Sequence, residues 1–344
     1  MEMDLDDIIG EALDRLINVE MRYASGVPRG IIHRLYDAAR AEAGRPLTTL
    51  AVEAIMAAVT PGDRVLIVTG AGAPPFLPVG ETDGPLGAVA IGHALDRGMG
   101  AKPIFLSEDR NLGPIAATAE AAGLSILPEE MFDARPAAAM CEALLLAPAD
   151  TTAQARELIA RHQPSMVIFV EKGAPNDKGV FHTITGRGRD RSVMASVDAL
   201  EEAARLAGIP TLGIGDGGNE AGFGRIPEAV AEIQEFGRIC ACGCGGGIGT
   251  VVGADVLVVA AISNWAGYAI AAGVALASNR PEALHTLDVE EDMLAACARA
   301  GAVDGLNGRQ MKGVDGTSAA TQTAILTMMQ NIVDNARRPL KREF

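Results

Sequence analysis

Apolar residues near the start of the chain recur at the spacing of an α-helix, with acidic residues between them. They are Leu5, Ile9, Leu13, Leu16, Ile17 and Met21. Residues 26–30 interrupt this pattern, which resumes at Ile32, and a further helix is predicted over residues 47–59. We therefore predict a helical N-terminal segment, residues 1–60, packed on a main domain of residues 61–344.

From residue 61 onward, short apolar runs alternate with helical patterns. The runs predict strands at residues 65–68, 104–106, 125–127, 166–170, 211–214 and 256–260. The helical patterns cover residues 85–97, 115–122, 152–162, 197–207, 266–277 and 317–333. Such alternation is typical of an α/β layered fold with a largely parallel sheet flanked by helices.

Polar residues follow four of the predicted strands, where folding alone does not require them. In open α/β sheets, ligands bind outside the carboxyl ends of the strands. The polar strand ends are Glu81 with Asp83, Glu171 with Lys172, Asp216 with Asn219 and Glu220, and Ser263 with Asn264. Their expected convergence at one edge of the sheet predicts a binding site there.

The loop after the strand at residues 211–214 holds six glycines between Gly213 and Gly224. Its polar side chains, those of Asp216, Asn219 and Glu220, are rich in oxygen, and the loop contains no Lys or Arg before residue 225. This composition suits a hard cation or an ammonium group better than a phosphate. A tight surface turn with incidental acids is the alternative.

Acidic residues at the strand ends are candidate ligands of Mg²⁺ or Mn²⁺, because hard cations prefer oxygen ligands. They are Glu81, Asp83, Asp216 and Glu220, with Asn219 as a neutral ligand. Asp304 and Asp315, each within the sequence Val-Asp-Gly, are possible additions. Capping of loops by Asp side chains is the alternative, and we favour it for Asp304 taken alone.

Residues 173–191 fit the strand–helix alternation poorly and carry positive charge at Lys178, Arg187, Arg189 and Arg191. The segment is a candidate lid over the acidic floor, and a solvated surface loop is the alternative. His182 lies within it as a candidate for acid–base chemistry or substrate binding. A structural histidine is the other interpretation.

Cysteine and charge usage limit the class of protein. Cys240, Cys242 and Cys244 alternate in a Gly-rich run, but the sequence has no C-x-x-C and no second cluster of ligands. We therefore interpret the three as small residues in a crowded turn, in a reducing compartment.

The formal net charge of −15 and the low aromatic content, 3%, argue against a nucleic-acid partner. No apolar run is long enough for a membrane span, and the N-terminus is acidic, unlike a signal or transit peptide. We expect a cytoplasmic protein with a small-molecule substrate, and a homo-oligomer is compatible with the sequence.

Four short motifs occur in a fixed order along the chain. They are GAG at residues 70–72 with Pro78 and GETDGP at residues 80–85, GIGDGGNE at residues 213–220, SNW at residues 263–265, and AVDG at residues 302–305. Together they resemble the C-terminal, catalytic-type domain of the D-glutamate cyclase family. The resemblance covers roughly residues 60–330.

The resemblance implies a carbon–oxygen lyase that dehydrates D-glutamate to 5-oxo-D-proline. A divalent cation, Mn²⁺ or Mg²⁺, would draw charge from the carboxylate that the amine attacks. Under this interpretation the metal and the amine are bound by four acids, Glu81, Asp83, Asp216 and Glu220, and Asp304 is a further metal ligand. Lys172 binds a substrate carboxylate. The remaining contacts to the substrate come from Asn219, Ser263, Asn264 and His182.

Two other functions remain open at this point. One is a metal-dependent hydrolase or lyase that acts on another lactam, amide or small carboxylate through the same site. The other is a non-catalytic binding protein for an acidic amino acid, although a binding protein does not require four acids in one cleft.

Overall fold

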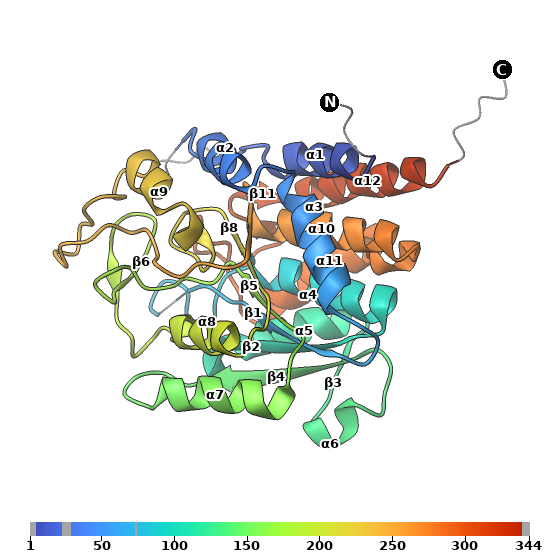
Figure 1. Cartoon of the computed structure of the whole chain (residues 1–344), viewed down its shortest axis with the longest axis horizontal. Coiled ribbons are helices and arrows are strands. Elements are labelled where there is room, and N and C mark those ends of the chain that lie inside the picture. The colour runs from blue at the N-terminus through green and yellow to red at the C-terminus, as the bar shows by residue number, and fades with distance from the viewer. Residues whose placement is uncertain (1–4, 23–28, 73, 339–344) are drawn as a thin grey trace.

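The structure is a computed structural model that describes residues 5–22, 29–72 and 74–338. Residues 1–4 of the acidic N-terminus and residues 26–28 of the predicted helix break lie outside the described residues. A parallel sheet of seven strands lies at the centre, with helices on both faces (Figure 1). The predicted α/β fold with a helical N-terminal segment is confirmed.

The central sheet has the strand order β3-β4-β2-β1-β5-β8-β9, and its neighbouring strands pair in parallel. Its strands are β1 (Arg64–Val68), β2 (Lys102–Glu108), β3 (Ser125–Ile126), β4 (Ala138–Leu144), β5 (Met166–Val170), β8 (Thr211–Gly215) and β9 (Val256–Val259). Two antiparallel hairpins lie outside it, β6 (Phe181–His182) with β7 (Gly188–Arg189) and β10 (Gly313–Val314) with β11 (Thr317–Ser318).

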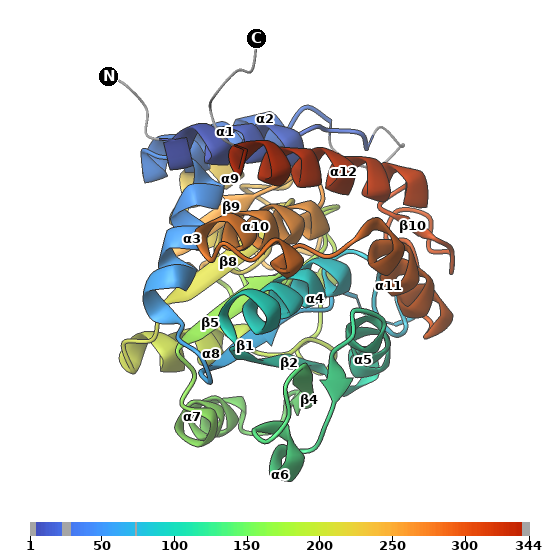
Figure 2. The same cartoon turned by 90° about the vertical axis from the view of Figure 1, so that its right-hand side faces the viewer.

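The described α-helices surround the sheet in layers (Figure 2). They are α1 (Leu5–Ile17), α2 (Ile32–Ala43), α3 (Leu47–Ala58), α4 (Pro85–Ala94), α5 (Leu112–Ala121), α6 (Glu129–Phe132), α7 (Thr151–His162), α8 (Val197–Leu206), α9 (Pro227–Ile233), α10 (Ser263–Ala277), α11 (Leu287–Arg299) and α12 (Ala319–Ala336). Short helical turns are η1 (Leu95–Met99), η2 (Asp109–Asn111), η3 (Phe223–Arg225) and η4 (Pro281–Ala283). None of these described helices has the length and apolar character needed to span a bilayer.

Side chains of β1 enter two separate cores, because successive residues of a strand point to opposite faces of the sheet. Val65 and Ile67 belong to the larger core, which α3, α4 and α10 cover, whereas Leu66 and Val68 belong to the smaller core. Helices α7 and α8 cover that second face, below the sheet in Figure 1. Full burial on both faces explains why the predicted strands are continuous apolar runs.

The N-terminal helices share the larger core rather than forming one of their own. Leu13 and Ile17 of α1 belong to it together with residues of α10. The Asp14 carboxylate of α1 also accepts hydrogen bonds from the backbone N–H groups of Leu47 (2.7 Å) and Thr48 (3.0 Å), and so caps the start of α3. Helix α1 is thereby held in place, and residues 18–22 follow it.

The order of the strands identifies where a site is expected. Strands β2, β4 and β3 lie in that order on one side of β1. Strand β5, which follows β4 in the sequence, pairs with β1 on its other side. In such sheets, ligands bind at this reversal, outside the carboxyl ends of the strands. The loops that follow β1, β5 and β8 start at this edge.

Candidate active site

Three carboxylates from three different strand-end loops meet at this edge. Asp83 lies in the loop between β1 and α4, Glu171 directly follows β5, and Asp216 directly follows β8. One oxygen of each lies within 4.8 Å of the others. The structure thus brings Asp83 and Asp216 together and adds Glu171, which the sequence placed at a strand end but not among the site acids.

Asp83 is held by the start of α10. Its carboxylate accepts hydrogen bonds from the backbone N–H groups of Ser263 (3.0 Å) and Asn264 (2.9 Å). A helix N-terminus stabilises negative charge. Even so, burial, together with repulsion from Asp315, raises the pKa of Asp83 to about 7.

Glu171 combines backbone strain with a proton-binding carboxyl. Its φ of 47° lies in the left-handed region, which is uncommon for a residue other than glycine. Ser263 Oγ donates a hydrogen bond to its Oε2 at 2.5 Å. Burial, and then repulsion from Asp216 and Glu220, raises the pKa of Glu171 well above its ordinary value. Strain and a perturbed acid at a strand end are both typical of catalytic groups.

Asp216 pairs with a residue that no sequence pattern indicated. Arg22 Nη1 lies 2.8 Å from Asp216 Oδ2 and 2.6 Å from Asp315 Oδ2, and all three side chains are buried. Burial raises the pKa of Asp216 well above its ordinary value, although the charge of Arg22 opposes the shift. Arg22 lies in the segment after α1, which had no predicted role in the site.

Glu81 lies within electrostatic reach of the same site but outside the group of three. Burial, and then repulsion from Asp315 and Asp83, raises the pKa of Glu81 well above its ordinary value. Arg189 of β7 is half-buried, and burial lowers the pKa of its guanidinium while the charge of Glu81 opposes the shift. A positive side chain of the 173–191 segment thus interacts with one of the acids.

The 173–191 segment is a hairpin packed against the loop of residues 236–251. The Gly186 carbonyl accepts a hydrogen bond from the Ala241 N–H at 3.0 Å, and the Pro175 carbonyl accepts one from the Val251 N–H at 3.1 Å. Within the segment, Arg191 Nε donates to the Gly179 carbonyl at 3.0 Å. The segment is therefore a folded element rather than a solvated loop.

Two predicted acids stabilise their own loops. The Glu220 carboxylate accepts hydrogen bonds from the backbone N–H groups of Gly217 (3.1 Å) and Gly218 (2.8 Å). Asp304 accepts hydrogen bonds from the backbone N–H groups of Leu306 and Asn307 in its own turn, and from that of Gly316 (2.7 Å) in the turn between β10 and β11. These bonds favour loop capping for both residues, the role already favoured for Asp304.

The predicted amides and His182 also contact the protein itself. Asn264 Oδ1 accepts hydrogen bonds from the Gly84 N–H (2.9 Å) and the Gly87 N–H (2.7 Å). Asn219 Nδ2 donates to the His182 carbonyl at 3.0 Å, and the His182 ring faces Cys242. Asn264 thus supports the start of α4, and Asn219 ties the loop after β8 to β6.

Lys172 has a partner that differs from the expected substrate carboxylate. Its Nζ lies 2.5 Å from Glu108 Oε2 and 2.9 Å from the Gly70 carbonyl oxygen, and both charged side chains are fully buried. Burial acts to raise the pKa of Glu108, but the charge and hydrogen bond of Lys172 outweigh it and lower that pKa. We therefore assign Lys172 a structural ion pair, which joins the carboxyl ends of β5 and β2.

The donor set of Asp83, Glu171 and Asp216 fits a hard divalent cation. All three offer carboxylate oxygens, and burial, with repulsion among the acids added to it, raises their pKa values, so that a bound cation would compensate their charge. A cavity of about 470 Å³ lies elsewhere, at the opposite edge of the sheet, where Lys102 begins β2. Its lining mixes acidic and basic residues and includes none of these acids.

Comparisons with known proteins agree with the motifs of the sequence. Human mitochondrial D-glutamate cyclase is 38% identical over 87 residues, which make up 24% of this chain and 13% of the human protein. The match therefore spans only a small share of that relative's length. A family model described as "D-glutamate cyclase-like, C-terminal" matches residues 13–330. This match covers both the parallel sheet and the acidic site, and the chain belongs to the D-glutamate cyclase-like family.

Proposed function

We propose that this protein is a lyase that closes D-glutamate to 5-oxo-D-proline with loss of water. Family membership supports the reaction class. The observation that carries the proposal is the cluster of Asp83, Glu171 and Asp216, with oxygens within 4.8 Å of one another at the reversal of strand order. Such a cluster suits a substrate with an ammonium group and a carboxylate to be activated.

The reaction needs groups that move protons. The α-amine forms a bond to the γ-carboxyl carbon, one C–O bond of that carboxyl breaks, and the two protons released by the ammonium group leave with the oxygen as water. We assign proton transfer to Glu171. Its raised pKa allows it to accept a proton from the ammonium group and return it to the departing oxygen.

The charged groups around the cluster suggest how the substrate is oriented. Glutamate carries a second carboxylate on the α-carbon, and Arg189 is the half-buried cation whose charge interacts with Glu81. We assign the α-carboxylate to Arg189 and the ammonium group to the acids beside it. Arg22 holds Asp216 and Asp315 in place through its two ion pairs.

Asp83 and Asp216 would hold the divalent cation, with Mg²⁺ and Mn²⁺ as the candidates, and Glu171, within 4.8 Å of both, would transfer protons. Bound there, the cation would supply charge stabilisation to the carboxylate that is attacked. Ser263 orients Glu171, and the backbone of α10 orients Asp83, so both carboxylates are fixed before any ligand binds.

The test is turnover of D-glutamate, followed by NMR, in wild type and in the Asp216→Asn variant. Wild type should form 5-oxoproline when Mg²⁺ or Mn²⁺ is present. Asp216→Asn should lower kcat/KM by ~10²-fold or more while the fold stays intact. Turnover of other lactams or amides but not of D-glutamate would favour the hydrolase alternative, and binding without any turnover would favour a binding protein.

A further inference from the structure

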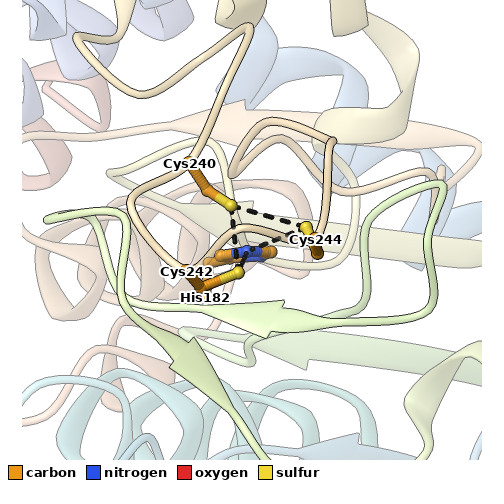
Figure 3. Close-up of side chains that lie close together, drawn as sticks. All are labelled: His182, Cys240, Cys242 and Cys244. Carbon is orange, nitrogen blue, oxygen red and sulfur yellow. Dashed lines mark hydrogen bonds between the residues drawn. The ribbon is translucent and has the colours of Figure 1, made fainter.

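We propose that His182, Cys240, Cys242 and Cys244 form a zinc site that joins the β6–β7 hairpin to the loop of residues 236–251. Figure 3 shows the His182 ring beside the three sulfur atoms, with the histidine and the cysteines on different segments. Nε2 or Nδ1 of His182 and the three Sγ atoms all lie within 4.8 Å of one another. The site is distinct from the acidic cluster, since it shares none of its residues.

The distances between these atoms match a four-coordinate metal site. Cys240 Sγ lies 3.0 Å from Cys242 Sγ and 3.4 Å from Cys244 Sγ. His182 Nε2 lies 3.3 Å from Cys242 Sγ and 3.7 Å from Cys244 Sγ. A tetrahedral zinc with Zn–S bonds of about 2.3 Å separates its ligands by about 3.8 Å. Each observed separation is shorter by less than about 1 Å, so small side-chain rotations would admit the ion.

The backbone between the cysteines is built to gather their side chains. Gly243 and Gly245 have φ values of 83° and 82°, in the left-handed region that glycine adopts without strain. A Cβ at either position would meet no atom within 4 Å, so space does not require glycine there. In an extended run, Cys240 and Cys244 would lie about 13 Å apart, too far to share an ion. The two glycines therefore allow the curled backbone that brings the sulfurs together.

The surroundings of the cluster resemble the second shell of a metal site. The Gly246 N–H donates to Cys244 Sγ at 3.4 Å, and Asn176 Nδ2 donates to the same sulfur at 3.5 Å. Such donors stabilise a metal-bound thiolate. Among the described residues, His182 Nδ1 has no hydrogen-bond partner, so the polar contacts of the ring are those of Nε2 with the thiols.

The chemistry of the donors selects zinc. Three thiolates and one imidazole are a common structural zinc set, whereas Mg²⁺ and Mn²⁺ prefer oxygen. All five cysteines are free thiols, and the described structure contains them at positions 141, 240, 242, 244 and 297. The sequence pattern of the three cysteines does not reveal His182 as the fourth ligand, because His182 lies 60 positions before Cys242.

Zinc at this site would also fix the position of the β6–β7 hairpin relative to the substrate. Only this further step rests on the proposed function. Arg189, assigned above to the substrate α-carboxylate, lies on β7, which pairs with β6 through Phe181 and His182. Zinc at His182 would therefore hold the strand that carries Arg189, the residue whose charge interacts with Glu81. The zinc site itself stands on the geometry of its four donors, whether or not D-glutamate is the substrate.

The experiment measures metal bound to reduced, full-length protein after purification and after dialysis with Zn²⁺ or Co²⁺. Wild type should hold about one zinc per chain, and Co²⁺ should give the absorption of tetrahedral thiolate-bound cobalt. Cys244→Ser and His182→Asn should weaken zinc binding at least ~10-fold. The matched control is Cys141→Ser, a half-buried cysteine on β4 outside the cluster, which should bind zinc like wild type.

Three results would overturn the zinc site. They are no zinc and no cobalt spectrum in reduced wild type, unchanged zinc content in both ligand variants, or a disulfide among the three cysteines in protein purified under reducing conditions. If the ligand variants fail to fold, the cobalt spectrum of wild type decides alone. Asp216→Asn should keep the cobalt spectrum, so a failed D-glutamate assay would leave the zinc site intact.

Discussion

The Arg22 guanidinium lies 2.6 Å from the Asp315 carboxylate, although 293 positions separate the two residues in the sequence. The same nitrogen lies 2.8 Å from Asp216. The segment after α1, the turn between β10 and β11 and the loop after β8 therefore meet at one buried cation. Arg22 offsets part of the repulsion among the acids of the site, and this role can be tested directly.

Replacing Arg22 should destabilise the fold. Arg22→Met leaves two buried carboxylates without their cation, and breaking a buried pair in this way costs about 3 kcal/mol or more. We expect that loss in the free energy of unfolding, measured with urea. Arg15→Met is the control, because Arg15 forms an exposed pair with Glu11 and should change stability by less than ~1 kcal/mol. Equal effects of the two substitutions would remove Arg22 from its structural role.

Glu171→Gln should abolish most of the activity while preserving the fold. Glutamine keeps the size of the side chain and can still contact Ser263, but it cannot carry a proton between substrate groups. We expect kcat to fall by ~10²–10⁴-fold, the usual contribution of a general acid–base group. Glu202→Gln, an exposed position on α8, is the control and should keep wild-type kcat. A kcat near wild type in Glu171→Gln would assign proton transfer to another acid.

Glu171→Gly should separate stability from activity at the same position. The substitution relieves the left-handed backbone, whose φ is 47°, and removes one repelling carboxylate. We expect a melting temperature equal to or above that of wild type, together with loss of turnover. A clear drop in melting temperature would show that the Glu171 side chain stabilises the fold instead.

Lys172→Met should act on stability, because Lys172 pairs with Glu108 in the interior. The substitution leaves the buried Glu108 carboxylate without its partner, and we expect a loss of about 3 kcal/mol in the free energy of unfolding. The double variant Lys172→Met/Glu108→Gln should recover part of that loss, because no unpaired charge remains. If Lys172→Met instead keeps wild-type stability and raises KM alone, the lysine contacts the substrate after all.

The acids of the site should make the metal-free protein less stable as pH rises. Burial raises the pKa values of Glu81, Asp83, Glu171, Asp216 and Asp315. The folded protein therefore binds more protons than the unfolded chain between the ordinary value of about 4 and the folded value, about 7 for Asp83. Stability falls with pH wherever the folded state binds more protons.

Melting temperatures measured from about pH 5 to about pH 8 should show this decline, since the folded-state pKa of Asp83, about 7, lies within that window. Excess Mg²⁺ should reduce it, because a cation that prefers carboxylate oxygens compensates the ionised acids without binding the thiols. Asp216→Asn should show a weaker dependence than wild type. A melting temperature that rises across this window without Mg²⁺ would contradict the protonation of these acids in the folded state.

Sequence patterns alone identified the layered fold and the edge of the sheet that carries the site. Strands such as β5 and β8 are buried on both faces, so their apolar runs stand out. Asp83 and Asp216 follow such runs, and the carboxyl ends of parallel strands lie at one edge. Strand β4 was missed, because its alanines do not favour a strand and only its pairing with β2 and β3 makes it one.

Only the tertiary structure decided which polar residues belong together. In the folded chain Arg22 pairs with Asp216, Lys172 pairs with Glu108, and His182 lies beside the three cysteines. Each contact joins positions far apart in the chain, and its free energy depends on burial and on distances of a few ångströms. Periodicity and local composition report which face of an element is buried and where it ends. They carry no information about which distant side chain will neutralise a charge or complete a set of ligands.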